Sequence, residues 1–527
     1  MRKISFYNSK HIALTPTNMK ICDNKTIEYG ISGNELMFRA SKSIYKRIIF
    51  NFISNKSKNF TCKNINFIKK RVVNRHLKLC VTIVAGSGNN GGDGLALAYI
   101  LKSKGFNVIV YAESSKTDSH KYYLEKCKNI KINILPFDKI SNIKSRIIVD
   151  CLFGIGFHGN VKDKYYDIIN FINSHKYIIS ADIASGLNAQ NGLCDTHHVN
   201  ANETICMQFL KVGHILNDGF DCSGDIYVSD IGIGLHTNYV KIVDENMIKT
   251  AFSPLKSNIH KSSNGIVGIV ANSDTCIGAG TFSYLSSKEV NNALVNINDN
   301  AEVSLISGAG LSKIFVHRDI IPQMLYKLNN AMVFPYQDFL NQKLSAIAYG
   351  MGVGEQNDML QSVLNRKLPT VLDADAINIL SKNESLLSLL HNNVIITPHP
   401  LEFSRLTKVP LGEIISNPIK YAQDFAKAHN ITVLLKGCTT TITNGEETYI
   451  NIAGSPCMAK GGSGDLLSGV IVALLARNIK PILAGSIASF ICGKSGERLA
   501  KTFGEYSVLP LDYPLEIRHT IIDLLNN

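Results

Sequence analysis

The sequence contains no tryptophan, no cysteine pair in a CxxC arrangement and no uninterrupted apolar stretch of membrane-spanning length. A transmembrane helix needs about 20 apolar residues, so no membrane span is predicted. The twelve cysteines also lack the spacing of zinc ligands, which favours reduced thiols in a cytoplasmic protein. The first ten residues, MRKISFYNSK, have no apolar core, and a secretory signal is not expected.

What the chain has is length and positive charge. Its 527 residues suffice for two to four domains. Lysine and arginine number 55 against 42 acidic residues, giving a net charge of +13, and much of the excess lies in residues 46–78. No nucleic-acid-binding motif accompanies that segment, so nucleic acid is not an expected partner. Positive charge can equally attract small anionic substrates such as nucleotides.

In the first half, polar loops follow three apolar runs that are typical of buried parallel strands. VTIVA at 81–85 leads into GSGNNGGDG at 86–94 and then into a predicted helix beginning LALAYIL. The spacing is not GxGxxG, so a dinucleotide fingerprint is absent. Asn89, Asn90 and Asp93 supply side-chain oxygens, which suit a cation together with a polar ligand.

Asp150 ends the second of these runs and Asp182 ends the third. A lone aspartate at a strand end is usually a helix cap or turn former. Because ligands gather at the carboxyl ends of parallel strands, three such loops together favour one site.

The motifs GSGNNGGDG, VDCLFGIGFHG and ADIASGLNAQNG resemble those of the NAD(P)H-hydrate epimerase domain. The resemblance implies a Rossmann-like three-layer fold, with Asp182 as the exposed acid–base residue. It implies K⁺ ligands at Asn90, Asp150 and Ser185. The implied contacts to the hydrated nicotinamide nucleotide are Asn89, Asn90, Gly91, Gly92, Asp93, Gly154, Ile155, Gly156, Phe157, His158, Gly159, Asn160 and Asp182. Phe38 and Ala184 depart from the family pattern, which usually has glutamate and proline there.

The second half repeats the pattern of strands ending in polar or glycine-rich loops. Asp373 and Asp375 follow one predicted strand, and they could equally cap a helix. His399 stands between two prolines after another, where it could contact a ligand or bond only to backbone. Lys436 marks a third strand end and could bind phosphate.

The most informative stretch is AGSPCMAKGGSGDLLSGVIVA, residues 453–473. Glycines 461, 462 and 464 precede an apolar helical pattern, and a glycine-rich helix N-terminus binds anions through backbone N–H groups and the helix dipole. Asp465 would repel a phosphate unless it moves a proton from a substrate hydroxyl beside that phosphate. The simpler alternative is that Asp465 is only an N-cap.

The motifs HKSSNG, GMGVG, LDADAIN, TPHPLEF, LLKGCTTTIT and AGSPCMAKGGSGDLLSG resemble the ADP/ATP-dependent NAD(P)H-hydrate dehydratase domain, a relative of the ribokinase superfamily. The resemblance implies Asp465 as base and Mg²⁺ at the phosphates. Its implied hydrate contacts are Ala279, Gly352, His399 and Asp465. Its implied ADP or ATP contacts are Lys436, Gly437, Cys438, Thr439, Thr440 and Gly464. The departures from the family pattern are Met351, Leu401, Cys457 and Lys460.

Together the two halves predict an α/β protein with an epimerase-like domain at 1–243, a linker at 244–262 and a dehydratase-like domain at 263–527. The expected partners are NADH hydrate, NADPH hydrate and ADP or ATP, with a homo-oligomer and no membrane. A Walker motif at Gly493 to Ser495 is rejected, because Ala488 replaces the required glycine. The alternatives are a ribokinase-like small-molecule kinase and a binding scaffold without activity.

Overall fold

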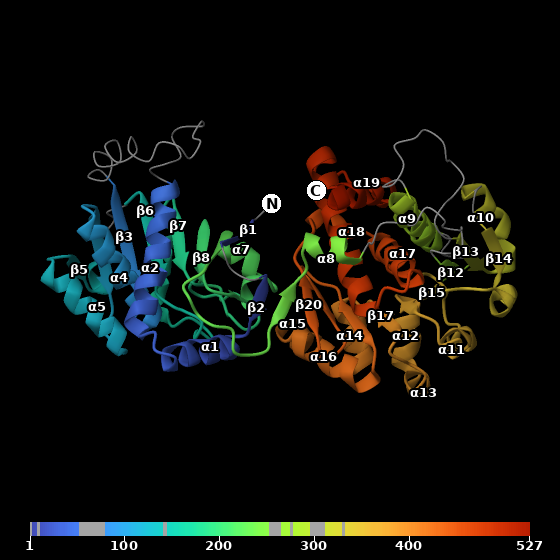
Figure 1. Ribbon diagram of the computed structural model, residues 1–527, viewed down its shortest axis with the longest axis horizontal. Coiled ribbons are helices and arrows are strands. Elements are labelled where there is room, and N and C mark those ends of the chain that lie inside the picture. The colour runs from blue at the N-terminus through green and yellow to red at the C-terminus, as the bar shows by residue number, and fades with distance from the viewer. Residues whose placement is uncertain are drawn as a thin grey trace. The chain divides into compact units, whose positions relative to one another are not determined.

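The computed structural model describes residues 3–7, 11–51, 79–140, 145–251, 265–273, 278–295, 311–328 and 332–526. Two compact units divide the chain, Met1–Val240 and Lys241–Asn527 (Figure 1). Most of the basic segment and residues 252–262 of the predicted linker lie outside the described residues. The exact domain limits remain a prediction, and helix α8 (Glu245–Ala251) occupies the start of the predicted linker. Among the described residues, no helix is long and apolar enough to span a membrane.

A parallel sheet forms the centre of the first unit, in the order β1-β10-β8-β7-β6-β3-β4-β5. A further short parallel pair joins β2 to β9. The strands are β1 (Ile4–Tyr7), β2 (Ile12–Leu14), β3 (Cys80–Ala85), β4 (Asn107–Ala112), β5 (Asn133–Leu135), β6 (Ile147–Cys151), β7 (Ile178–Ala181), β8 (Glu203–Met207), β9 (Leu210–Lys211) and β10 (Asp225–Ser229). The helices are α1 (Pro16–Glu28), α2 (Gly33–Ile49), α4 (Asn89–Ser103), α5 (Asp118–Asn129), α6 (Tyr166–Asn173) and α7 (Gly219–Ser223).

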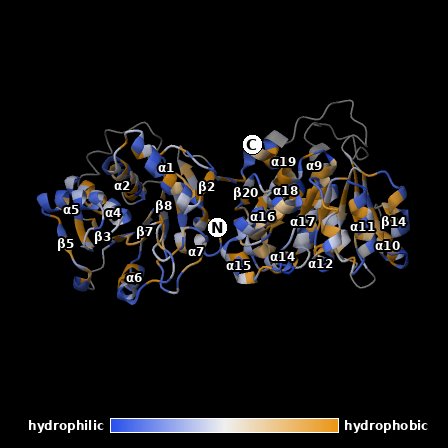
Figure 2. Cartoon of the chain, turned by 90° about the horizontal axis from the view of Figure 1, so that it is seen from below, coloured by the Kyte–Doolittle hydropathy of each residue, from blue (hydrophilic) through white to orange (hydrophobic). Residues whose placement is uncertain are grey.

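Alternate residues of the central strands enter two separate cores, as expected for a sheet covered on both faces. In β6, Ile147 and Val149 pack with α2 and α4, whereas Ile148 packs with α6 on the other face. Figure 2 colours the chain by hydropathy and shows helix α5 of this unit as largely hydrophilic. The predicted three-layer α/β fold is confirmed for this unit.

Helix α4 begins earlier than predicted. The sequence NNGGDG was expected to be loop, but Asn89 already lies in the helix. Its glycines allow this because the backbone packs very tightly here. A Cβ on Gly91 would lie 1.8 Å from the carbonyl oxygen of Gly86, so no side chain fits. The first turns of α4 therefore lie directly against the end of β3.

Cys194 and Cys222 form a disulfide in the first unit, so the prediction of reduced thiols is wrong for this pair. The other described cysteines carry free thiols, and most of them are buried.

The second unit has its own sheet, in the order β14-β13-β12-β15-β16-β17-β18-β19-β20-β11. Its strands are parallel except where β19 runs antiparallel to β18 and β20. The strands are β11 (Val240–Ile242), β12 (Ile266–Val270), β13 (Leu311–Val316), β14 (Met332–Pro335), β15 (Ala346–Tyr349), β16 (Thr370–Leu372), β17 (Val394–Ile396), β18 (Thr432–Leu435), β19 (Thr440–Thr443) and β20 (Thr448–Asn451). The helices that follow α8 are α9 (Gly278–Val295), α10 (Ile321–Lys327), α11 (Asn357–Asn365), α12 (Asp375–Lys382), α13 (Glu384–Leu387), α14 (Pro400–Thr407), α15 (Leu411–Ser416), α16 (Pro418–His429), α17 (Ser463–Ala476), α18 (Pro481–Phe503) and α19 (Tyr513–Asn526).

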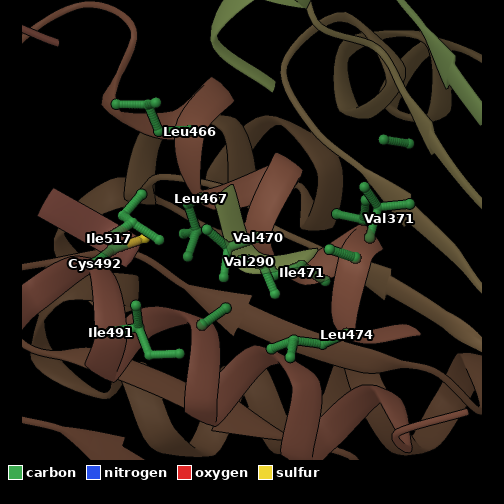
Figure 3. Packing of buried hydrophobic residues seen from close by; sticks show 14 of the residues in the cluster. Val290, Val371, Leu466, Leu467, Val470, Ile471, Leu474, Ile491, Cys492 and Ile517 are labelled. Carbon is green, nitrogen blue, oxygen red and sulfur yellow. The ribbon is translucent and has the colours of Figure 1, made fainter. Parts of the chain in front are cut away.

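Helix α17 lies in the interior of this unit. Nearly its whole length is buried, and it packs against α9, α18 and the strands β12, β15 and β16. Figure 3 shows Val470 and Ile471 of α17 beside Val290 of α9 and Val371 of β16. Such packing fixes the start of α17 against the carboxyl ends of the parallel strands. The rejected Walker motif lies inside α18.

Candidate functional site

The first unit contains a cavity of about 670 Å³ at the carboxyl ends of β3, β6 and β7. The predicted hydrate contacts that line it are Asn89, Asn90, Asp93, Gly154, Ile155, Gly156, Phe157 and Asp182. Gly91 and Gly92 lie behind this wall, where the tight packing of α4 requires glycine. His158, Gly159 and Asn160 are not part of the lining.

Three oxygen-bearing side chains, those of Asn90, Asp150 and Ser185, hydrogen-bond to one another or to the segment that follows β6. Asp150 is fully buried, and its carboxylate accepts hydrogen bonds from the Ser185 hydroxyl at 2.6 Å and the Ser185 backbone N–H at 2.9 Å. Burial raises the pKa of Asp150, and these bonds oppose the rise. Asn90 donates to the carbonyl of Phe153 at 2.6 Å, while its own side-chain oxygen is buried with no partner in the described part of the chain. A buried amide oxygen without a partner, near a segment that also contacts a buried carboxylate, fits a cation such as K⁺.

Asp182 and Lys211 lie side by side in the wall of the same cavity. The backbone of Asp182 has a φ of +63°, in the left-handed region that few residues other than glycine, asparagine and aspartate adopt. The Asp182 carboxylate forms an ion pair with the Lys211 ammonium group, which is itself fully buried. Burial disfavours the charge on Lys211, but the facing carboxylate prevails and raises its pKa. Only 16% of the Asp182 side chain is exposed, so the prediction of an exposed carboxylate is wrong.

Two further carboxyl groups line this cavity, those of Asp93 and Asp23. Asp93 was predicted only as a contact, and burial together with Asp182 raises its pKa well above the usual range. Asp23 of α1 was not predicted at all. Burial raises its pKa to about 6. The available signal was the spacing Met19, Asp23 and Ile27, which places an acid within an apolar helix face.

In the second unit, Asp465 lies in the first turn of α17. The helix N-cap is Gly462, with a φ of +97°, so the interpretation of Asp465 as a simple N-cap is wrong. Burial is the largest influence on Asp465 and, with the nearby Asp373 carboxylate, raises its pKa to about 7. A carboxylate with that pKa can accept a proton near neutral pH.

Asp373 lies close to Lys436 and Gly464, the two predicted phosphate contacts, and near Asp465. It is buried, accepts a hydrogen bond from Ser468 at 2.9 Å and lies 3.1 Å from the Lys436 ammonium group. Burial opposes ionisation of Asp373, yet Lys436 and Ser468 lower its pKa. A Cβ on Gly464 would lie 3.4 Å from the same carboxylate. Lys436 and Gly464 therefore both lie beside the Asp373 carboxylate, and the charges of Asp373 and Lys436 also act on Asp465.

The remaining nucleotide predictions follow β18. Gly437, Cys438 and Thr439 form the turn into β19, and Thr440 begins that strand. The Thr439 hydroxyl is buried with no hydrogen-bond partner among the described residues, and so is that of Ser463 in α17. Buried hydroxyls without a protein partner are suited to hydrogen-bonding a bound ligand.

The predicted hydrate contacts lie on three other segments. Ala279 begins α9, whose Ser283 donates to the Asp465 carbonyl at 2.8 Å. Gly352 follows β15 with a φ of +72°. His399 is the N-cap of α14, and its ring accepts from two backbone N–H groups, so a local capping role accounts for one of its nitrogens.

Comparison with known proteins identifies both halves. Residues 33–213 match the family described as YjeF-related protein N-terminus, and residues 300–517 match the NAD(P)H-hydrate dehydratase family. A bifunctional NAD(P)H-hydrate repair enzyme of Hyperthermus butylicus is 30% identical over 442 residues, covering 79% of each chain. The chain belongs to this family of bifunctional NAD(P)H-hydrate repair enzymes. The resemblance predicted from the motifs is thereby confirmed.

Other members of the repair-enzyme family match over similar lengths. The Coxiella burnetii enzyme is 28% identical, covering 92% of this chain and 94% of its own, and the Escherichia coli enzyme is 29% identical, covering 82% of each. Among solved structures, an ADP/ATP-dependent NAD(P)H-hydrate dehydratase from Bacillus subtilis, co-crystallised with ATP and Mg²⁺, is 23% identical. It has a TM-score of 0.45 and covers 54% of this chain and 99% of its own.

Several departures from the repair-enzyme motifs have a structural place. Met351 and Cys457 are buried in the core of the second unit. The Lys460 ammonium group donates to the carbonyls of Tyr506 and Val508, which ties its loop to the segment before α19. Met351 and Cys457 therefore act in packing, whereas Lys460 acts through hydrogen bonds to the backbone.

Replacing Asp373 by Asn is expected to shift the pH dependence of the second unit. The negative charge of Asp373 is one cause of the raised pKa of Asp465. Without it, the pKa of Asp465 should fall, and activity should persist to a pH lower by about one unit. Dehydration rates measured from pH 5 to 9 test this, with Asp375→Asn as the matched control. An acid limb that stays near pH 7 in Asp373→Asn would contradict the assignment.

Proposed function

We propose that this chain repairs hydrated NADH and NADPH in two steps. The first unit interconverts the R and S forms of the hydrate, and the second dehydrates the S form at the expense of ADP or ATP. Family membership supports the overall reaction. The observation that carries the chemistry is the grouping of Asp465, Lys436 and Gly464 at the start of α17.

In the second unit, Asp465 accepts the proton of the hydrate hydroxyl, and that oxygen attacks the terminal phosphoryl group of the nucleotide. Lys436 and the backbone N–H groups at the start of α17 stabilise the negative charge on the transferring group. Phosphate then leaves, and loss of a ring proton restores the reduced nicotinamide. Hydroxide is a poor leaving group, which explains why a nucleotide is consumed.

The proposed contacts follow the predictions. The nucleotide is held by Lys436, Gly437, Cys438, Thr439, Thr440 and Gly464, and the hydrate by Ala279, Gly352, His399 and Asp465. Mg²⁺ would neutralise the phosphates, and no side chain here is assigned to it. The repair enzyme is further proposed to act in the cytoplasm as a homo-oligomer.

In the first unit, the cavity binds the same hydrate, and Asp182 moves a proton at the hydrated carbon. Asn90, Asp150 and Ser185 would hold K⁺, which would supply a fixed positive charge beside the anionic nucleotide. The proposed contacts include the lining residues named above.

Exchanging K⁺ for choline is expected to destabilise the first unit and to slow epimerisation. An ion that binds only the folded state stabilises it by about 2.7 kcal/mol at 100 times its dissociation constant. Thermal unfolding at stepped K⁺ concentrations measures this directly. Asn90→Ala removes the orphaned oxygen and should abolish the response. Equal melting temperatures with and without K⁺ in the unaltered chain would exclude the site.

The function itself is tested by incubating separated R and S forms of NADH hydrate with ADP or ATP and following NADH absorbance. Recovery from both forms is the expected result. Recovery from the S form alone would mean that the first unit is inactive. Phosphorylation of the hydrate without NADH formation would favour a simple kinase, and no reaction at all would favour a scaffold.

A further inference from the structure

Helix α1 presents an acid to the cavity of the first unit. Met19, Asp23 and Ile27 recur every four residues and line the cavity together, whereas Cys22 and Thr26 of the same helix face the core. The Asp23 carboxylate makes no hydrogen bond or ion pair within the described part of the chain. Helix geometry therefore holds this group at the cavity wall without a structural partner.

The cavity combines three carboxyl groups with one buried cation. Asp23, Asp93 and Asp182 all line it, and so does Lys211. The lysine is committed to Asp182 by their ion pair. Charges buried in a common cavity repel one another unless they are paired, so the other two carboxyl groups favour their neutral forms. The wall thus carries a carboxylate paired with a lysine, Asp182, and on a different element a carboxyl group without such a partner, Asp23.

We propose that Asp23 and Asp182 are the acid–base pair that inverts the hydrated carbon. This inference rests on the proposed epimerase function of the first unit and names its second catalytic residue. A carboxylate held by a lysine and a carboxyl group without a charged partner in one cavity have different surroundings, which suits such a division of roles.

The reaction balances without any further reagent. Asp23 donates its proton to the hydroxyl, the carbon–oxygen bond breaks, and water leaves as the ring-nitrogen lone pair forms a carbon–nitrogen double bond. Water then adds to the opposite face, the electron pair returns to nitrogen, and Asp182 takes the proton of the entering water. In the reverse direction the two residues exchange roles. Proton transfer through solvent restores the starting state of the pair.

The role of Asp23 as an acid also predicts how the rate of epimerisation depends on pH. Burial raises the pKa of Asp23 to about 6, Lys211 opposes the rise, and Asp182 adds to it. The acid form is lost as pH rises through that value, so acid-catalysed epimerisation should slow above pH 6. The other charged groups that line the cavity are Lys20, Asp93, Glu113, Asp182 and Lys211.

The test measures conversion of purified R hydrate to S hydrate by chromatography, without nucleotide, in the full chain. Asp23→Asn should lower the enzymatic rate by about 10²-fold and remove the decline above pH 6. Glu28→Gln changes an exposed carboxylate of the same helix in the same way and should leave the rate unchanged. Asp23→Glu restores an acid and should recover part of the activity.

The outcomes separate this inference from the proposed function. If the unaltered chain does not exceed the spontaneous rate, the epimerase function itself fails. If it does and Asp23→Asn keeps both its rate and its pH profile, the role of Asp23 is overturned. A loss in Asp23→Asn that Asp23→Glu does not relieve would also overturn it, because shape rather than acidity would then matter.

Discussion

Replacing Asp465 by Asn is expected to lower the turnover of the second unit by about 10³–10⁴-fold, near the upper end for a single proton-transfer residue. Asparagine matches the shape of aspartate but cannot accept the hydroxyl proton. Lys436 and the start of α17 remain in place, so nucleotide and hydrate should still bind. The Michaelis constants should therefore change by only a few-fold while turnover collapses.

The measurement is NADH recovery from S hydrate at saturating ADP or ATP. Because the pKa of Asp465 is raised to about 7, the base form is lost as pH falls through 7, and the unaltered enzyme should slow below that pH. Asp424→Asn makes the same change on an exposed residue of α16 and serves as the control. Turnover of Asp465→Asn within threefold of the unaltered chain would contradict the mechanism.

The strand ends explain why much of the site could be predicted from sequence. In a parallel sheet, each apolar run must end at the same edge, so residues far apart in the chain, such as Asp150 and Asp182, are brought together. The glycines at 461, 462 and 464 likewise mark a helix start, because the N-cap Gly462 has a φ of +97°, a backbone conformation that favours glycine. Local patterns were sufficient in both cases.

Roles that depend on contacts between side chains far apart in the sequence were not predicted. Whether Asp373 caps α12 or supports Asp465 depends on where Lys436 and Ser468 lie, and those contacts join segments 63 and 95 residues away. Asp23 is a similar case, because its role depends on the cavity rather than on its own helix. The depth of Asp182 was misjudged for the same reason, since Lys211 covers it.

Helix α4 shows a different limit. Glycine and asparagine normally indicate a loop, and NNGGDG contains little else. Close packing of α4 against β3 overrides that preference, since only glycine at position 91 permits the approach. Helix propensity is a weak influence compared with such contacts.

The largest expected loss of stability lies in a buried ion pair of the first unit. Glu203 of β8 accepts two hydrogen bonds of 2.8 Å from Arg47, and Asn51 and Tyr177 also donate to it. The Arg47 guanidinium lies 3.4 Å from the centre of the Tyr227 ring. Exposed fractions are 12% for Arg47 and 7% for Glu203, so solvent does little to stabilise either charge alone.

Glu203→Leu should therefore lower the free energy of unfolding of the first unit by about 3–5 kcal/mol, because it removes the carboxylate that balances the charge of the buried Arg47. The double change Arg47→Met with Glu203→Leu should recover most of that loss, since two apolar groups can replace a buried pair at little cost. Glu35→Gln breaks an exposed pair with Arg39 and should cost less than about 1 kcal/mol. Because the chain lacks tryptophan, circular dichroism during urea unfolding is the measurement. Equal losses in the single and double variants would show that packing, rather than the unpaired charge, determines the effect.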